Sequence, residues 1–75
     1  MNYSENDSPL YIASVIGERL KRIRLNQDMT QAEIASKAWV SRRAVLRAEK
    51  GDVRLAELIA ILGVLNMLGN LNQLI

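Results

Sequence analysis

The stretch from Thr30 to Gly51 constrains the fold of this chain most, because it predicts two short helices joined by a tight turn. Thr30 and Glu33 have the spacing of a capping box, in which each side chain accepts a hydrogen bond from the backbone N–H of the other residue. The first helix is therefore expected to run from about Gln31 to Ala38. One face of this helix carries the apolar residues that we expect in a core: Ile34, Ala35 and Ala38.

The second helix of the pair is expected from about Arg42 to Lys50. Ser41 is a favourable N-cap for it, and Gly51 is a favourable residue to end it. At about 100° per residue this helix has two different faces. Val45 and Ala48 lie on the face that can pack against the preceding helix. The opposite face carries cations with a leucine among them: Arg42, Arg43, Leu46, Arg47 and Lys50.

Length and composition limit the chemistry available to the chain. Its 75 residues make one small domain and include neither cysteine nor histidine. Disulfides, thiol or histidine catalysis and most zinc sites are excluded on this ground. The sequence also lacks a glycine-rich phosphate loop and a cluster of metal ligands, so we expect no catalytic residue, no metal and no cofactor.

The distribution of charge is more informative than the net charge of +2. The segment Arg42–Lys50 carries four cations and one acid, whereas no charged residue follows Glu57. A cationic middle and an uncharged C-terminal end indicate two surfaces with different roles.

A flexible arm is expected at residues 1–8, followed by a single domain over residues 9–75. Ser8 is a favourable N-cap and Pro9 a favourable first helical residue, because proline has no N–H to leave unpaired. Apolar residues then recur at intervals of three and four and predict one helix to about Asn26, with this buried face: Leu10, Ala13, Ile16, Leu20 and Ile23. Alternatively, the part from Leu10 to Ser14 is a separate turn or a short extended piece.

The same helix has one weak position and one basic half. Gly17 is expected to weaken it by roughly 1 kcal/mol relative to alanine. Arg19, Lys21 and Arg22 are expected to form a solvated face.

Two further helices are expected after Gly51, which makes five in all. The fourth is marked by Leu55, Leu58, Ile59 and Leu62, with Gly63 as its end. Asn66 is expected to cap a short fifth helix that carries Met67, Leu68, Leu71, Leu74 and Ile75. Amide side chains and Gly63 interrupt this apolar end, so we expect no membrane span and a cytoplasmic location.

A domain of this size cannot bury so many leucines and isoleucines in its own core. A twofold homodimer solves the problem economically. We expect its interface at Leu65, Leu68, Leu71, Leu74 and Ile75. The alternative is that the fifth helix folds back onto the first.

The chain resembles the phage-repressor-like (Xre-type) helix-turn-helix family, to which the lambda and 434 repressors belong. The matching blocks are Thr30-Gln31-Ala32-Glu33-Ile34-Ala35, Val40-Ser41-Arg42-Arg43 and Arg47-x-Glu49-x-Gly51, within a resemblance that covers about residues 16–64. The resemblance implies an all-α, compact five-helix domain whose third helix lies in the major groove of DNA. It also implies an ion pair between Arg24 and Glu49, and a C-terminal part that dimerises.

The resemblance further implies which side chains contact DNA. The arginines of the third helix would reach base edges, where their planar forks suit O6 and N7 of guanine. Gln31 would contact the DNA backbone and brace the reading residues, and the hydroxyls of Thr30 and Ser41 would donate to phosphates. Leu46 would lie against a thymine methyl or, alternatively, pack under Trp39. The expected DNA-binding set is Thr30, Gln31, Ser41, Arg42, Arg43, Leu46, Arg47 and Lys50.

Three residues depart from the family pattern. Trp39 stands where glycine is usual, at a position that favours the left-handed backbone conformation. It implies strain or a different turn, and it is expected to bind a partner or to cover the helix junction. Ala48 stands where a bulkier aliphatic residue is common, and Leu46 where a polar residue is. We expect either a re-registered core under this helix or a core that Leu46 partly fills.

The leading hypothesis is a sequence-specific DNA-binding transcriptional regulator of the repressor type, a homodimer on an inverted-repeat operator. The alternative is an antitoxin-type module that binds a toxin protein and also regulates its own promoter. Trp39, the apolar C-terminal end and the acidic N-terminus favour that alternative. A purely structural oligomerisation domain is the third hypothesis.

Overall fold

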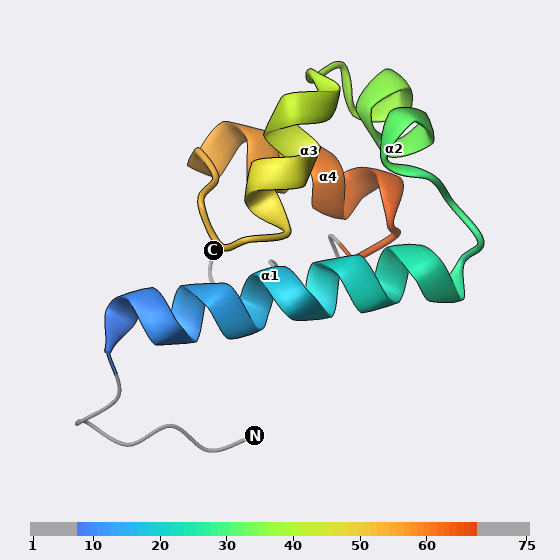
Figure 1. Cartoon of the computed structure of the whole chain (residues 1–75). Helices are drawn as coiled ribbons and strands as arrows, with labels where there is room; N and C mark the ends of the chain where they lie inside the picture. The colour runs from blue at the N-terminus through green and yellow to red at the C-terminus, as the bar shows by residue number, and fades with distance from the viewer. Residues whose placement is uncertain (1–7, 68–75) are drawn as a thin grey trace.

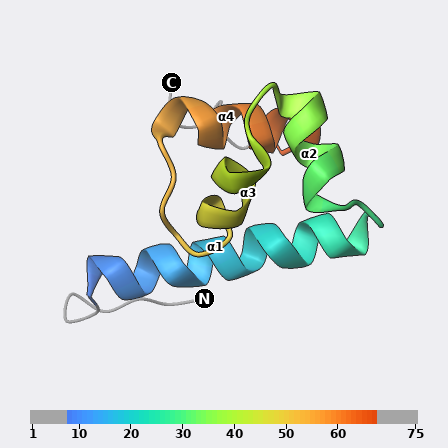
Figure 2. The same ribbon diagram turned by 45° about the horizontal axis from the view of Figure 1, so that its top comes forward.

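The structure, a computed structural model, describes residues 8–67, and within them the chain forms four α-helices and no strand. The helices are α1 (Pro9–Asn26), α2 (Gln31–Ala38), α3 (Arg42–Ala48) and α4 (Leu55–Val64). The long α1 lies along one side of the molecule, and the three shorter helices gather against it (Figure 1). The first turns of α1 extend past this group in both views (Figures 1 and 2). The all-α expectation is confirmed for these residues, whereas residues 1–7 of the expected arm and residues 68–75 of the expected fifth helix lie outside them.

The helix starts follow from local capping. Ser8 accepts a hydrogen bond from a backbone N–H at the start of α1, and Ser41 does the same for α3. The capping box that starts α2 is formed, with 3.0 Å from the Glu33 nitrogen to Thr30 Oγ1 and 2.9 Å from the Thr30 nitrogen to Glu33 Oε1. α1 is continuous from Pro9, so the alternative of a separate N-terminal turn is wrong.

Two helix ends differ from the expected ones. α3 ends at Ala48 rather than Lys50, and Gly51 then reverses the chain with a φ of 91°. α4 passes through Gly63 and ends at Val64, so Gly63 is not its stop. The helix is instead ended by Asn66, whose φ of 61° is the left-handed conformation typical just after a helix. An N-cap has extended backbone, so the expected capping role of Asn66 for a fifth helix is wrong.

The core forms where all four helices meet. Its members are Leu20, Ile34, Ala35, Ala38, Val45, Ala48, Ile61 and Leu65. The expected core faces of α2 and α3 are confirmed. The expected core face of α1 is wrong at its outer end, because Leu10 is 83% and Ile16 47% exposed. Gly17, Leu20 and Arg24 are the buried residues of α1.

The helix that Leu55, Leu58, Ile59 and Leu62 mark is formed, but not all of these residues are buried. Leu55 is 73% exposed and Ile59 43% exposed, while Ile61 and Leu65 are buried. Leu65 was expected in a dimer interface, but at 2% exposure it already packs inside its own chain. Leu68, Leu71, Leu74 and Ile75 lie outside the described residues. None of the helices within residues 8–67 has the length and apolar character that a membrane crossing requires.

Candidate nucleic-acid interface

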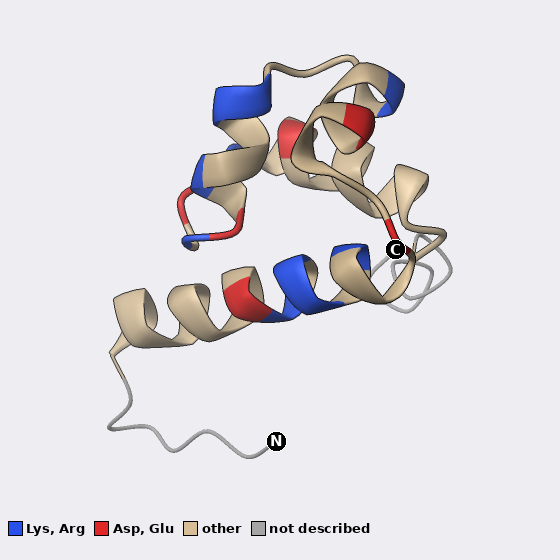
Figure 3. Cartoon of the chain, turned by 45° about the vertical axis from the view of Figure 1, so that its right-hand side comes forward, with Lys and Arg blue, Asp and Glu red and all other residues tan. Residues whose placement is uncertain are grey.

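The exposed side of α3 and the turn that follows it form a cationic edge, which consists of Arg42, Arg43, Arg47 and Lys50. Ala44, Val45 and Ala48 occupy the opposite side and are at most 2% exposed. Basic residues mark α3 at its start and near its end in Figure 3. Within residues 8–67, none of the four side chains of the cationic edge forms an ion pair. α3 therefore has one face fixed in the core and one face of free positive charge.

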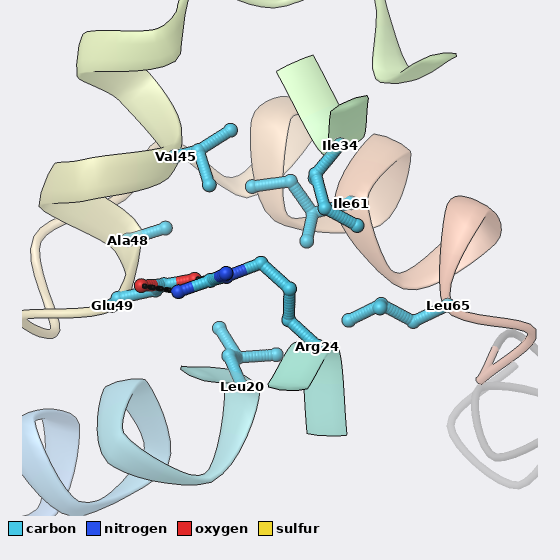
Figure 4. Close-up of a pocket in the computed structure, with 8 residues that line it drawn as sticks. All are labelled: Leu20, Arg24, Ile34, Val45, Ala48, Glu49, Ile61 and Leu65. Carbon is cyan, nitrogen blue, oxygen red and sulfur yellow. Dashed lines mark hydrogen bonds and ion pairs between the residues drawn. The ribbon is translucent and has the colours of Figure 1, made fainter. Parts of the chain in front are cut away.

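Glu49, the acid that follows this helix directly, is withdrawn from the surface into an ion pair with Arg24. Arg24 Nε lies 2.6 Å from Glu49 Oε2, and Nη2 lies 3.3 Å from Oε1. Both residues are buried, at 7% and 8% exposure. The guanidinium and the carboxylate face one another among apolar side chains (Figure 4). A two-pronged contact of this kind fixes the orientation of both groups as well as their distance.

The pair also ties together the elements that position α3. Arg24 Nη1 donates to the backbone oxygen of Met29 at 2.7 Å, just before α2. The side-chain amide of Gln31, the first residue of α2, donates to Glu49 Oε1 at 3.1 Å. One carboxylate thus joins α1, the start of α2 and the end of α3. Its negative charge is compensated inside the protein, so it does not offset the cationic edge.

Residues 20–68, well over half of the chain, match the model of the helix-turn-helix family. The chain belongs to the Xre-type, phage-repressor-like helix-turn-helix family. Its members are DNA-binding transcription regulators. No curated protein matches the chain. The family match begins at Leu20, so the first half of α1 precedes the part that the family shares.

The polar residues expected to contact DNA occupy the start of each helix of the helix-turn-helix pair. Thr30 and Ser41 are exposed, and each hydroxyl oxygen accepts a backbone hydrogen bond as a cap. Because a hydroxyl is also a donor, both O–H groups remain able to donate to a phosphate oxygen. Gln31 is half-buried, and its side-chain amide nitrogen donates a hydrogen bond to the carboxylate of Glu49. This hydrogen bond holds the buried carboxylate, and within residues 8–67 Gln31 forms no side-chain hydrogen bond to the cationic edge.

The turn of this helix-turn-helix pair differs from the family pattern at Trp39. Its φ of 59° and ψ of 37° place it in the left-handed region, where glycine is usual. The side chain is 94% exposed, so it does not cover the helix junction. Leu46 is 41% exposed and cannot be packed under Trp39, so that alternative is wrong. Leu46 instead stands on the exposed side of α3, among the cations.

The remaining departure, Ala48, lies in the core. Ala48 is 1% exposed and lies at the end of α3, where α1 comes close. A β-carbon on Gly17 of α1 would lie only 2.8 Å from the backbone oxygen of Ala48. The missing side chain of Gly17 therefore permits this close approach to the backbone of α3, and the exposed Leu46 fills no gap there. Among residues 8–67, no group of three acidic side chains is placed to hold a metal ion.

Proposed function

We propose that this protein is a sequence-specific transcriptional regulator of the repressor type, which binds as a homodimer to an inverted-repeat operator. α3 enters the major groove, with its cationic edge toward the bases. The observation that carries the proposal is a contrast on α3 and the turn after it. Four exposed cations there form no ion pair within residues 8–67, and the neighbouring acid is buried and neutralised by Arg24. Such a surface favours an anionic duplex.

The proposed contacts divide into reading and positioning groups. Arg42, Arg43 and Arg47 read base edges, because a guanidinium donates two parallel hydrogen bonds to O6 and N7 of guanine. We therefore infer guanines in each half-site. Lys50 and the hydroxyls of Thr30 and Ser41 contact phosphates, which set the register. Leu46, exposed between the arginines, lies against a thymine methyl.

The homodimer is supported by the exposed apolar side of α4. Leu55 and Ile59 are four residues apart, so they lie on the same side of the helix, and both are exposed. Ala56 is exposed next to them, and no charged residue follows Glu57 in α4. A second copy related by twofold symmetry would bury the same patch from both sides. To bind half-sites one turn of duplex apart, the dimer must hold its two α3 helices about 34 Å apart.

Selection of bound duplexes from a random-sequence pool tests the proposal. A recurring inverted repeat with guanines in each half is expected. Arg43→Ala should then bind the selected duplex more weakly by about 1–3 kcal/mol and lose preference at one base position. Lys21→Ala removes an exposed cation from α1 and serves as the matched control. If both variants weaken binding equally on all duplexes, the cations attract DNA without reading it.

A second candidate function is the antitoxin-type module. The exposed Leu10 and Tyr11, on the part of α1 that extends past the other helices, favour a protein partner. A toxin gene beside the gene for this chain, and a stable complex of the two purified proteins, would support it. Since antitoxins of this family also bind their own promoters, DNA binding by itself does not decide between the two.

A further inference from the structure

Trp39 combines two unfavourable features that no contact within residues 8–67 offsets. Its backbone is left-handed, with a φ of 59°, which costs a bulky residue free energy that glycine avoids. Its side chain is 94% exposed, so burial returns almost nothing. A large aromatic held in this way is consistent with a contact made only when the protein is bound.

The local structure fixes the direction of this side chain. The backbone N–H groups of Trp39 and Val40 both donate to the oxygen of Ala35, which closes the end of α2. Ala38, before Trp39, is 7% exposed, and Val40, after it, packs against the core. With both neighbours turned inward, the indole is held outward at the turn rather than free to fold back.

The surroundings of Trp39 are positively charged. From Ser36 to Arg47 every charged residue is a cation: Lys37, Arg42, Arg43 and Arg47. The nearest acids along the chain are Glu33, which is engaged in the capping box, and Glu49, which is buried against Arg24. This charge favours an anionic surface over an apolar or cationic one.

We propose that Trp39 is a DNA-contacting residue, whose indole lies against the sugar–phosphate backbone beside the groove that α3 enters. This rests on the proposed function. Trp39 is three residues before Arg42, so their Cα atoms are at most about 11 Å apart. The ring covers apolar deoxyribose atoms, and its N–H donates to a phosphate oxygen. The contact adds affinity that depends little on salt, in contrast to that of the arginines.

Fluorescence tests the contact directly, because Trp39 is the only tryptophan of the chain. Addition of the selected duplex to the full chain should shift its emission to shorter wavelength or quench it, with the same midpoint as binding measured by anisotropy of labelled DNA. A constant emission spectrum through a complete binding isotherm would overturn the contact.

The variant Trp39→Gly separates binding from folding. Glycine accepts the left-handed backbone, so the melting temperature should rise by about 4–8 °C. DNA binding should weaken about tenfold, with an unchanged slope of affinity against salt concentration. A protein that becomes more stable and binds less well cannot owe its loss of binding to unfolding. Tyr11→Ala, an exposed aromatic on α1, is the matched control and should bind like wild type.

The remaining outcomes are distinguishable. If wild type binds the selected duplex and Trp39→Gly binds it equally well, the inference is wrong while the proposed function stands. If wild type binds no duplex, both are wrong. If the emission shifts with protein concentration or with a purified protein partner, and not with DNA, Trp39 belongs to a protein interface and the inference is overturned.

Discussion

Gly17 lies so close to the end of α3 that a β-carbon on it would stand 2.6 Å from the backbone oxygen of Glu49. The same β-carbon would lie 2.6 Å from the backbone nitrogen of Gly51. A β-carbon on Gly51 would in turn lie 2.6 Å from the backbone of Ala13. α1 therefore touches the end of α3 backbone to backbone, and this contact adds to the packing of α3 against α2 and α4.

Gly17→Ala should destabilise the protein by about 1–3 kcal/mol, because backbone atoms cannot move aside as a flexible side chain can. The steric cost of the added β-carbon exceeds the roughly 1 kcal/mol by which alanine favours a helix relative to glycine. Urea unfolding followed by circular dichroism measures it. Glu18→Ala, at the exposed neighbouring position, should change the free energy of unfolding little. A Gly17→Ala protein more stable than wild type would show that the helices are not in close contact.

Glu49→Ala should cost about 3–5 kcal/mol in the free energy of unfolding, because Arg24 is left buried without its counter-ion. Arg24→Ala should have a similar effect. The double variant should lose clearly less than the sum of the two, since no lone charge remains buried. Gln31→Ala removes one hydrogen bond to the same carboxylate and should cost about 1 kcal/mol. Strict additivity of the two charge removals would contradict a coupled pair.

The pKa of Glu33 lies below its ordinary value of 4.5, chiefly because the backbone N–H of Thr30 donates to its carboxylate. The Thr30 side chain and the charge of Lys37 act in the same direction. Because folding lowers this pKa, the ionised carboxylate stabilises the fold at pH values above its ordinary pKa. This stabilisation is lost as the pH falls through the pKa of the folded state. The stability of Glu33→Gln, measured between pH 3 and 7, should therefore fall less steeply on acidification. Parallel curves for variant and wild type would contradict a role of this carboxylate in the cap.

Ile59→Glu should abolish the proposed dimer while the helical content of the chain is retained. The reason is that Ile59 is exposed on α4 and a charge there cannot be buried in an apolar interface. Sedimentation velocity should show a monomer at concentrations where wild type is dimeric. Leu65→Ala should behave differently and cost about 2–5 kcal/mol of folding stability, because Leu65 is in the core. Unchanged self-association of Ile59→Glu would place the interface elsewhere.

Local signals in the sequence predicted most of the helix-turn-helix pair. Capping by Ser8, Thr30 and Ser41 involves residues two or three positions apart, so the sequence contains the whole interaction. The two faces of α3 were predicted for a similar reason, because its apolar and cationic residues are cleanly separated.

The faces of α1 and α4 could not be predicted in this way. Both helices carry apolar residues on more than one side, so periodicity does not decide which side is buried. The decision comes from contacts distant in sequence, such as the backbone contact at Gly17, which turns Ile16 outward. Leu65 was assigned to an interface because its neighbours are apolar too, and only the packing of α4 places it inside.

Readout of guanine by α3 is tested most directly with 7-deazaguanine, which lacks the N7 acceptor. 7-Deazaguanine should be substituted for each guanine of the selected half-site in turn. The affinity of wild type and of Arg43→Ala should be measured for each substituted duplex. At one guanine the replacement should weaken wild type about tenfold and leave Arg43→Ala unaffected, because the variant no longer donates to N7. Equal weakening of both proteins at every guanine would contradict the proposed contact.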